Sequence, residues 1–524
     1  FTFGQRIQKI NVHFPPPVTN ATPMTPGIIS QYANSVSKGL KPFLSCCPVG
    51  PSFSPRHHVP SYDGVRSFAL LWVISFHTQY FLGGMYNSKS ADLLLHRCST
   101  LTSCLPLVSG HFGVDVFFVL SGLLVTHNLI YDLHLHPSSS SIPLWKRVCK
   151  YFAKRVFRIV PCFYLTFTIY CTVAAILSSG VKKCDAFSLV TQSLLFYQNQ
   201  VAIDQQCMAW GWTVGVEVQF YILAPLIIAS PKLLPFLRST SATLISIGVI
   251  FSALTLSSIY ARQEVATSYD PPLDSSALHL TAHHTGVDYF KVMYTSTQTR
   301  IFACFVGSVA GVVVVAIREM KVESEARIKN LKAAFDLGSL VFMYLVVRSG
   351  VFADFDEKEK GWIEAGNTKI GFLVWMRVNL SLLVGGLLVC LGGTEVMRRL
   401  TNEDPNPLPK CLLNVLISRT ISLPSLLLKP SWASPLPGRT VHLVSYSSFL
   451  LHPLLVNGWY IVVTKIDGNF ITEGILTKDW IWTALVVINF LLSYSVSVVM
   501  YGLVEFPMQE VGKVFIKRFI GEDE

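Results

Sequence analysis

Two ionisable side chains, Arg66 and His77, interrupt an apolar stretch that runs from Ser61 to Gly84. They are eleven positions apart, so a helix places both on one face and about 16 Å apart along its axis. An imidazole can take a proton near neutral pH, and a guanidinium carries a fixed charge that suits phosphate. Each residue also has a structural interpretation: Arg66 as an anchor at the membrane surface, and His77 as a hydrogen-bonded packing residue.

Two carboxylates lie inside other apolar stretches. Asp115 is near the start of "GVDVFFVLSGLL", and Glu217 is in "WTVGVEVQFYIL", with Tyr221 one helical turn further along the same face. An ionisable residue inside a membrane span costs roughly 3 kcal/mol on insertion scales, so each calls for a partner or a task. For Glu217 the chain offers His77 and Arg377 inside other spans. Asp115 equally fits a helix start, where free N–H groups stabilise a carboxylate.

A basic strip occurs in "KYFAKRVFRIVPCFY", directly before an apolar run. Lys150, Lys154 and Arg158 follow one another at a spacing of four residues, which places them on one helical face, with Arg155 beside Arg158. Such a strip can bind a polyphosphate. Attraction to anionic lipid headgroups is the alternative.

The elements that carry these residues are predicted from the composition. Of the 524 residues 51% are hydrophobic and 14% charged, and the mean hydropathy is +0.47. These values argue against an ordinary soluble globular protein. Continuous apolar runs of about 20 residues, each able to cross roughly 30 Å of hydrocarbon, predict an all-α polytopic transmembrane helical bundle and not a β-barrel. The sequence predicts about ten spans, at 64–84, 112–131, 157–178, 213–230, 240–260, 301–317, 335–352, 371–393, 441–463 and 480–504.

Basic residues set the predicted orientation of the bundle. The loop between the second and third spans and the start of the third are rich in Lys and Arg, whereas the loop before the second span has only Lys89 and Arg97. By the positive-inside rule the basic loop is cytoplasmic, and both termini then face the cytoplasm. The formal charge of +11 is concentrated in such clusters, which points to anionic lipid or a phosphorylated ligand and not to nucleic acid.

Four cysteines fall in two predicted outer loops. Cys98 and Cys104 lie in one, and Cys184 and Cys207 lie in the other. In an oxidising lumen they can form two disulfides, with Cys184 and Cys207 as the preferred pair. Because connectivity cannot be read from sequence, four free thiols remain the alternative.

Composition divides the chain into three parts. Residues 1–60 are rich in Pro, Ser and Thr and are predicted to be a disordered N-terminal tail. Residues 61–510 form the predicted transmembrane domain, and residues 511–524 a short cytoplasmic tail. Residues 411–428 are apolar but interrupted by Arg419 and Pro424, so we expect an interfacial or re-entrant segment.

Taken together, these stretches resemble the membrane-bound acyltransferase-3 family, and within it the nose-resistant-to-fluoxetine-like branch. The resemblance rests on several motifs that occur in the expected order over roughly residues 60–510. They are "DGVRSFALLWVISFHT", "GVDVFFVLSGLL", "RVFRIVP", "CMAWGWTVGVEVQFYILAPL", "YTSTQTRIFACFVGSVAG" and "HLVSYSSFLLHPLLV".

The resemblance implies an integral membrane O-acyltransferase. Such an enzyme moves an acyl group, often acetyl, from acyl-coenzyme A to a hydroxyl of a sugar, a lipid or a small molecule. It implies His77 as the general base, because an alcohol is a poor nucleophile until its proton is removed. Asp115 and Glu217 are further catalytic candidates, which would orient the acceptor or lock the bundle.

The donor is expected at the cytoplasmic surface, where Arg66, Arg155 and Arg158 would bind the phosphates of coenzyme A. We expect acyl-coenzyme A as a co-substrate, no permanently bound cofactor and no metal, because neither a His-x-x-x-His spacing in a span nor a Gly-rich phosphate loop occurs. Membrane lipid is the further expected partner, and the endoplasmic reticulum or plasma membrane the expected location. A non-catalytic transporter or lipid-handling protein on the same scaffold is the alternative, although no internal repeat of the kind seen in many transporters is found.

Overall fold

The computed structural model describes residues 28–44, 59–86, 105–135, 142–177, 189–201, 206–233, 239–269, 290–351, 369–401, 441–466 and 479–520. Within these ranges every regular element is a helix and no strand occurs. The predicted all-α fold class is therefore confirmed.

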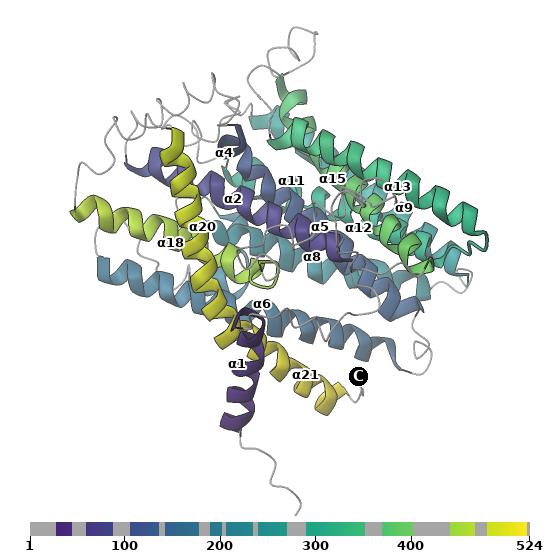
Figure 1. Cartoon of the computed structure of the whole chain (residues 1–524), viewed down its shortest axis with the longest axis horizontal. Helices are drawn as coiled ribbons and strands as arrows, with labels where there is room; N and C mark the ends of the chain where they lie inside the picture. The colour runs from purple at the N-terminus through teal and green to yellow at the C-terminus, as the bar shows by residue number, and fades with distance from the viewer. Residues whose placement is uncertain are drawn as a thin grey trace, which may run out of the picture.

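Helix α5 (Gly113–Ile130) lies at the centre of the bundle (Figure 1). Its sequence is apolar all round, a pattern that favours a central position, and most of its side chains are buried. Around it pack α2 (Pro60–Tyr86), α8 (Trp212–Ala229), α12 (Phe302–Glu319) and α15 (Lys369–Leu400). Four helices from distant parts of the chain thus converge on α5.

Glycines allow α5 and α12 to approach each other closely. A Cβ atom at Gly122 would overlap the carbonyl oxygen of Cys304, and one at Gly307 would overlap the carbonyl oxygen of Val119. Each helix therefore places a glycine against the backbone of the other. This is the small-residue packing that membrane helices use where lipid gives no hydrophobic drive to associate.

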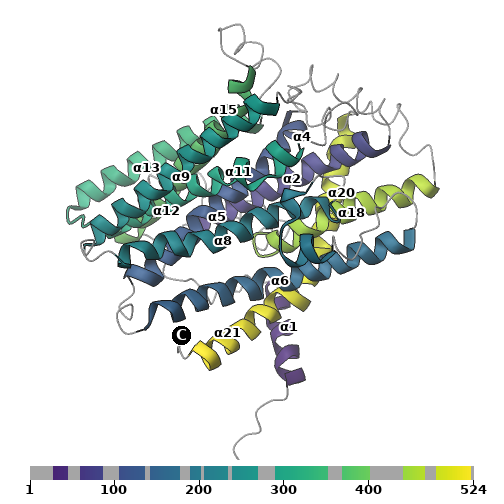
Figure 2. The ribbon, with the colours of Figure 1, turned by 180° about the vertical axis from the view of Figure 1, so that it is seen from behind.

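Two pairs of helices flank this centre on opposite sides (Figure 2). On one side α9 (Thr240–Tyr269) and α13 (Glu325–Val346) pack against α12 and α15. On the other side α18 (Ser445–Ile466) and α20 (Asp479–Met500) pack against α2. The helix that carries Arg66 and His77 therefore lies between the central helix and α18.

Three helices lie together at one edge of the bundle, the lower edge in Figures 1 and 2. They are α6 (Leu144–Leu177), α21 (Phe506–Ile520) and α1 (Ile28–Leu44), and α21 contacts both of the others. Helix α6 starts in the basic region and continues without a break into the apolar run, so one helix carries the whole basic strip.

Short helical segments connect the long helices. They are α4 (Leu105–Ser109), η2 (Gly110–Phe112), η3 (Tyr131–Leu135), η5 (Leu189–Leu194), η6 (Gln198–Gln200), η8 (Ala209–Gly211), η9 (Ser230–Leu233), η11 (Phe290–Thr295), α11 (Thr297–Arg300), η12 (Val347–Val351) and η14 (Tyr501–Glu505).

Ten of the long helices coincide with the ten predicted spans. Within the described part of the chain, eight segments are long and apolar enough to cross a membrane, and α2 and α18 are not among them. The polytopic bundle is thus confirmed. The count of ten and the orientation relative to the cytoplasm stay predictions.

The predicted disorder of residues 1–60 is wrong for the part that forms α1. Here Val36, Leu40 and Phe43 recur at helical spacing and are half-buried. The ring of Phe43 lies 5.8 Å from that of Tyr501. The Pro- and Ser-rich sequence on either side dominates the composition of residues 1–60 and masks this local apolar stripe.

The boundary predicted at residue 510 falls inside helix α21. This helix continues to Ile520 and packs on α6, where the rings of Phe157 and Phe515 lie 5.6 Å apart. Most of the expected cytoplasmic tail is therefore a helix that covers α6.

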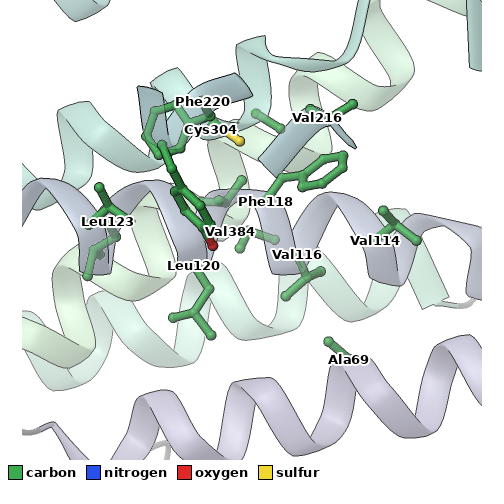
Figure 3. Packing of buried hydrophobic residues seen from close by; sticks show 14 of the residues in the cluster. Ala69, Val114, Val116, Phe118, Leu120, Leu123, Val216, Phe220, Cys304 and Val384 are labelled. Atoms are coloured by element: carbon green, nitrogen blue, oxygen red, sulfur yellow. The ribbon is translucent and has the colours of Figure 1, made fainter. Parts of the chain in front are cut away.

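The apolar core surrounds α5 (Figure 3). Phe118 lies on the same side of α5 as Phe220 and Cys304, whereas Val116 and Leu120 point toward the helix that carries Ala69 (Figure 3). This helix therefore has packed neighbours on both sides, which fixes the rotation of Asp115 and Ser121 about its axis.

Cys207 is disulfide-bonded. The other three cysteines of the predicted pairs, Cys98, Cys104 and Cys184, lie outside the described residues, as does the segment 411–428.

Candidate active site

His77 of α2 faces a second histidine, His452 of α18. Nδ1 of His77 lies 3.0 Å from Nε2 of His452, and the ring centroids are 4.8 Å apart. His452 is fully buried, whereas His77 is partly exposed. Sequence reasoning missed His452, although it is an ionisable residue inside an apolar span, the same signal that selected His77.

Aromatic rings enclose His77. The centroids of Phe76, Tyr80 and Phe81 lie 5.2, 6.2 and 5.5 Å from that of the imidazole. Phe81 stacks on the ring, and the other two meet it edge-on. This apolar wall limits contact with water, which strengthens any hydrogen bond that the imidazole makes.

Asp115 binds two arginines in the interior. Its carboxylate lies 3.1 Å from a guanidinium nitrogen of Arg300 and 2.5 Å from one of Arg377. All three side chains are less than 5% exposed. Arg377 therefore pairs with Asp115, and the suggestion that it pairs with Glu217 is wrong.

Sequence reasoning also missed Arg300. It stands in "YTSTQTRIFACF", where α11 ends just before α12 begins, so it looks like an ordinary charged residue at the end of a span. Arg300 is buried because α11 packs against α8 and α9, and the sequence does not show this packing.

Rings connect the arginine pair to the histidine pair. The Tyr294 ring lies 5.4 Å from the guanidinium of Arg300 and 5.2 Å from that of Arg377. The ring centroid of Tyr294 lies 6.5 Å from that of His111, and the His111 centroid lies 5.4 Å from that of Phe76. Phe76 in turn contacts the His77 ring. Asp115 thus lies on the far side of an aromatic layer from His77.

Glu217 has a different environment from the one expected. Its carboxylate lies near the side chains of Tyr221 and Ser121, whose hydroxyl oxygens are 2.9 Å apart, and it interacts electrostatically with Arg155 and Arg158. The Arg155 guanidinium lies 4.8 Å from the centre of the Tyr221 ring. The proposed partner His77 is instead engaged with His452, so Glu217 belongs to the basic strip of α6.

The three arginines assigned to donor binding come together. Arg66 interacts electrostatically with Arg158 and Arg155 and lies 4.0 Å from Asp63 on its own helix. In the predicted strip Lys154 is exposed, so Arg155 and Arg158 are the members that face inward.

A second carboxylate, missed from the sequence, faces this arginine group. Glu505 of η14 interacts electrostatically with Arg158 and Arg66, and Ser447 donates a hydrogen bond of 2.5 Å to it. It is 2% exposed. In the sequence it directly follows the last predicted span, which ends at residue 504, and it lies two residues before Pro507.

The candidates therefore form two groups along α2. One group holds the three arginines with Glu217 and Glu505, and the other holds the histidine pair. Since Arg66 and His77 lie on one helix, about 16 Å of helix separates the groups. Within the described residues no set of three or more His, Cys, Asp and Glu side chains is placed to hold a metal ion.

We compared the sequence with known protein families. A model of the acyltransferase-3 family, described as an acyltransferase domain, matches residues 59–502. The chain belongs to this family. The acyltransferase-3 domain contains both histidines, Asp115 with its two arginines, and the arginine group, whereas Glu505 lies just beyond the matched residues.

Three curated relatives match part of the domain. Nose resistant to fluoxetine protein 6 of Caenorhabditis elegans is 26% identical over 32% of this chain and 22% of its own length. O-acetyltransferase OatA of Staphylococcus aureus is 29% identical over 34% of this chain and 25% of its own. Putative peptidoglycan O-acetyltransferase YrhL of Bacillus subtilis is 27% identical over 39% of this chain and 29% of its own. The chain thus spans less than a third of each of these relatives, and no solved structure matches it significantly.

Proposed function

We propose that this protein is an integral membrane O-acyltransferase. It transfers an acyl group, with acetyl as the first candidate, from acyl-coenzyme A to a hydroxyl of a sugar, a lipid or a small molecule. The observation that carries the proposal is the spacing along α2 in an acyltransferase-3 domain: His77 of α2 joins a histidine pair, and about 16 Å away Arg66 of the same helix joins an arginine group. Two relatives are named O-acetyltransferases, which supports transfer to oxygen.

The arginine group is the proposed site for the donor's phosphates. The guanidinium groups of Arg66, Arg155 and Arg158 can form paired hydrogen bonds to phosphate oxygens. The carboxylates of Glu217 and Glu505 interact electrostatically with these arginines and offset the repulsion between their like charges. In coenzyme A the pantetheine arm separates the phosphates from the thioester, as the helix separates Arg66 from His77.

His77 is the proposed general base. It takes the proton from the acceptor hydroxyl as the oxygen attacks the thioester carbonyl carbon. The carbon–oxygen bond forms and the carbon–sulfur bond breaks when the intermediate collapses, and the thiolate of coenzyme A takes up the proton. General base catalysis of this kind contributes about 10²–10⁴-fold in rate.

Asp115 is proposed to act through the arginines that it holds. Its carboxylate is buried and forms ion pairs with both guanidinium groups, so it is poorly placed to take the hydroxyl proton. Asp115 holds Arg377, which lies over the Tyr294 ring, and Tyr294 contacts His111 on the path of rings that leads to His77. Asp115 therefore orients the acceptor side of the site or locks the bundle.

Release of free thiol tests the function. Full-length protein in lipid nanodiscs is mixed with acetyl-coenzyme A, with and without a set of sugars and alcohols, and the thiol and the acetylated product are measured. Release that depends on the protein and rises with an acceptor supports the transferase. A protein that binds acetyl-coenzyme A but never releases thiol or product would contradict it.

A further inference from the structure

The contacts of the histidine pair continue on both sides. Beyond the contact between the rings, Nδ1 of His77 lies 3.1 Å from the carbonyl oxygen of Val73, and Nδ1 of His452 lies 3.0 Å from that of Ser448. Each carbonyl belongs to the preceding turn of the same helix. A line of polar atoms thus runs from the backbone of α18 through both rings to the backbone of α2.

The two carbonyls fix the tautomers of both rings. A carbonyl oxygen only accepts, so Nδ1 of His452 must donate to Ser448, which leaves its Nε2 as an acceptor in the neutral ring. That acceptor faces Nδ1 of His77, so Nδ1 of His77 must carry a hydrogen. This N–H is shared between Nε2 of His452 and the carbonyl oxygen of Val73. The opposite assignment would place a nitrogen lone pair against an oxygen lone pair at 3.0 and 3.1 Å.

We propose that His452 is a positioning residue, whose Nε2 atom holds His77 in the tautomer that leaves Nε2 of His77 unprotonated for the acceptor hydroxyl. This inference rests on the proposed function, in which His77 is the base. The arrangement of exposure agrees with it, because His77 is partly exposed and His452 is 0% exposed.

His452 also has a role once the proton has moved. When Nε2 of His77 takes the hydroxyl proton, the ring becomes an imidazolium and its Nδ1–H becomes a stronger donor. The neutral Nε2 of His452 accepts that stronger hydrogen bond and so stabilises the charged intermediate. The proton on Nε2 then goes to the thiolate, and both rings return to their starting tautomers.

A separate network holds the same helices together. Tyr460 donates to the carbonyl oxygen of Thr78 at 3.3 Å, and Asn489 of α20 donates to the Thr78 hydroxyl at 3.0 Å and to the Tyr460 hydroxyl at 2.9 Å. The contact between α2 and α18 therefore does not depend on the histidine pair alone. Tyr460→Phe breaks this network and leaves the pair in place, so it serves as the matched control.

The first test reads the tautomers directly. Full-length protein with ¹⁵N-labelled histidine is examined by solid-state NMR in lipid, and His77→Ala and His452→Phe assign the two rings. We expect a protonated Nδ1 and an unprotonated Nε2 in both rings. A His77 ring with its hydrogen on Nε2 would overturn the inference.

The second test separates rate from binding. In His452→Phe, which keeps a ring without an acceptor, we expect the kcat of thiol release from acetyl-coenzyme A to fall about 10–100-fold, with KM within about threefold. In His452→Gln the amide oxygen near the former Nε2 position accepts instead, and most of the rate returns. Tyr460→Phe should lower the unfolding temperature but leave kcat per folded molecule near that of the wild type.

The outcomes distinguish the two levels of the proposal. If His77→Ala retains the wild-type rate, or if the wild type releases no thiol, the proposed function fails while the NMR result still decides the tautomer. If His77→Ala is inactive but both His452 variants keep the wild-type kcat, only the role of His452 is rejected. In the His77→Ala background a further loss on adding His452→Phe would also reject it, because a positioning residue acts only through His77.

Discussion

Arg155, Lys154 and Arg158 are neighbours on α6, yet they differ in what they contact. The two arginines face Glu217, and the Arg155 guanidinium lies over the Tyr221 ring, whereas Lys154 is exposed. We therefore assign phosphate binding to Arg155 and Arg158, which face inward, and expect no role in it for the exposed Lys154.

Removal of either arginine should weaken binding of the donor. Each charge-assisted contact contributes about 1.5–3 kcal/mol, so we expect Arg155→Ala and Arg158→Ala to raise the Kd of coenzyme A roughly 10–100-fold. Lys154→Ala, as the matched control, should change it less than about threefold. Calorimetry on the three variants makes the comparison, and an equal effect in all three would show a diffuse surface attraction in place of a site.

At the scale of elements, Asp115 joins α5 to α11 and α15 through its two arginines. In Asp115→Asn the buried guanidinium groups lose their countercharge, and removing one member of a buried ion pair destabilises a protein by about 3–5 kcal/mol. We expect a lower unfolding temperature and a smaller folded fraction in nanodiscs. Asp63→Asn weakens longer contacts, at 4.0 and 3.6 Å, with the partly exposed side chains of Arg66 and His442, and should have a much smaller effect. A similar loss of stability in both variants would contradict this role.

The contact between α5 and α12 gives a second prediction at this scale. In Gly122→Ala and Gly307→Ala the new methyl group meets the backbone of the other helix, which cannot move aside as a side chain can. We expect a loss of about 1–3 kcal/mol in each, as for other overpacked sites. Gly458→Ala in α18 has no atom within 4 Å of the new methyl and should be neutral. Thermal unfolding of the three variants measures the difference, and an equal result would show that the helices are not closely packed.

The helices could be predicted from sequence because their signals are local. Apolar runs gave the ten long segments, and the eleven-residue spacing placed Arg66 and His77 on one face of α2. Arg66 comes close to Arg155 and Arg158 because all three lie at the same end of their spans, whereas their role in donor binding stays a prediction. These properties depend on composition and helical repeat alone.

The partners could not be predicted because they depend on which helices pack together. His452, Arg300 and Glu505 lie on segments distant in sequence from the residues that they contact, and no spacing shows the rotation of one helix against another. For the same reason the sequence offers His77 and Arg377 as candidate partners of Glu217 and does not show that it faces Arg155 and Arg158. For α1 the limit was different, because a short apolar stripe was averaged with the polar sequence around it.

For the whole molecule, the proposed donor site requires one orientation in the membrane. The arginine group must face the cytoplasm, where coenzyme A is available. Tags placed near Ser139 and near Lys183, positions outside the described residues, should therefore differ in accessibility in sealed vesicles, with the first on the cytoplasmic side. Labelling with a reagent that cannot cross the membrane decides this, and equal labelling of both tags would refute the predicted topology.

Variants of the arginine group and of the histidine pair should also differ in their kinetic effects, since the arginines are proposed to bind the donor and His77 to transfer the proton. Arg66→Ala should raise the acetyl-coenzyme A concentration needed for the half-maximal rate, with turnover remaining at saturation. A lost phosphate contact removes binding that the ground state and the transition state share. Steady-state kinetics over a wide range of donor concentrations shows this, and a fall in kcat with unchanged KM would argue against phosphate binding by Arg66.

The role of His77 as general base is tested by the rate of acyl transfer per folded molecule in His77→Ala, measured together with coenzyme A binding. We expect transfer to fall by at least about 100-fold while the Kd of the donor stays within about threefold, because the imidazole moves a proton and does not hold phosphate. A structural role alone predicts a lower yield of folded protein with near-normal specific activity. Wild-type transfer by folded His77→Ala would contradict the assignment of His77 as the base.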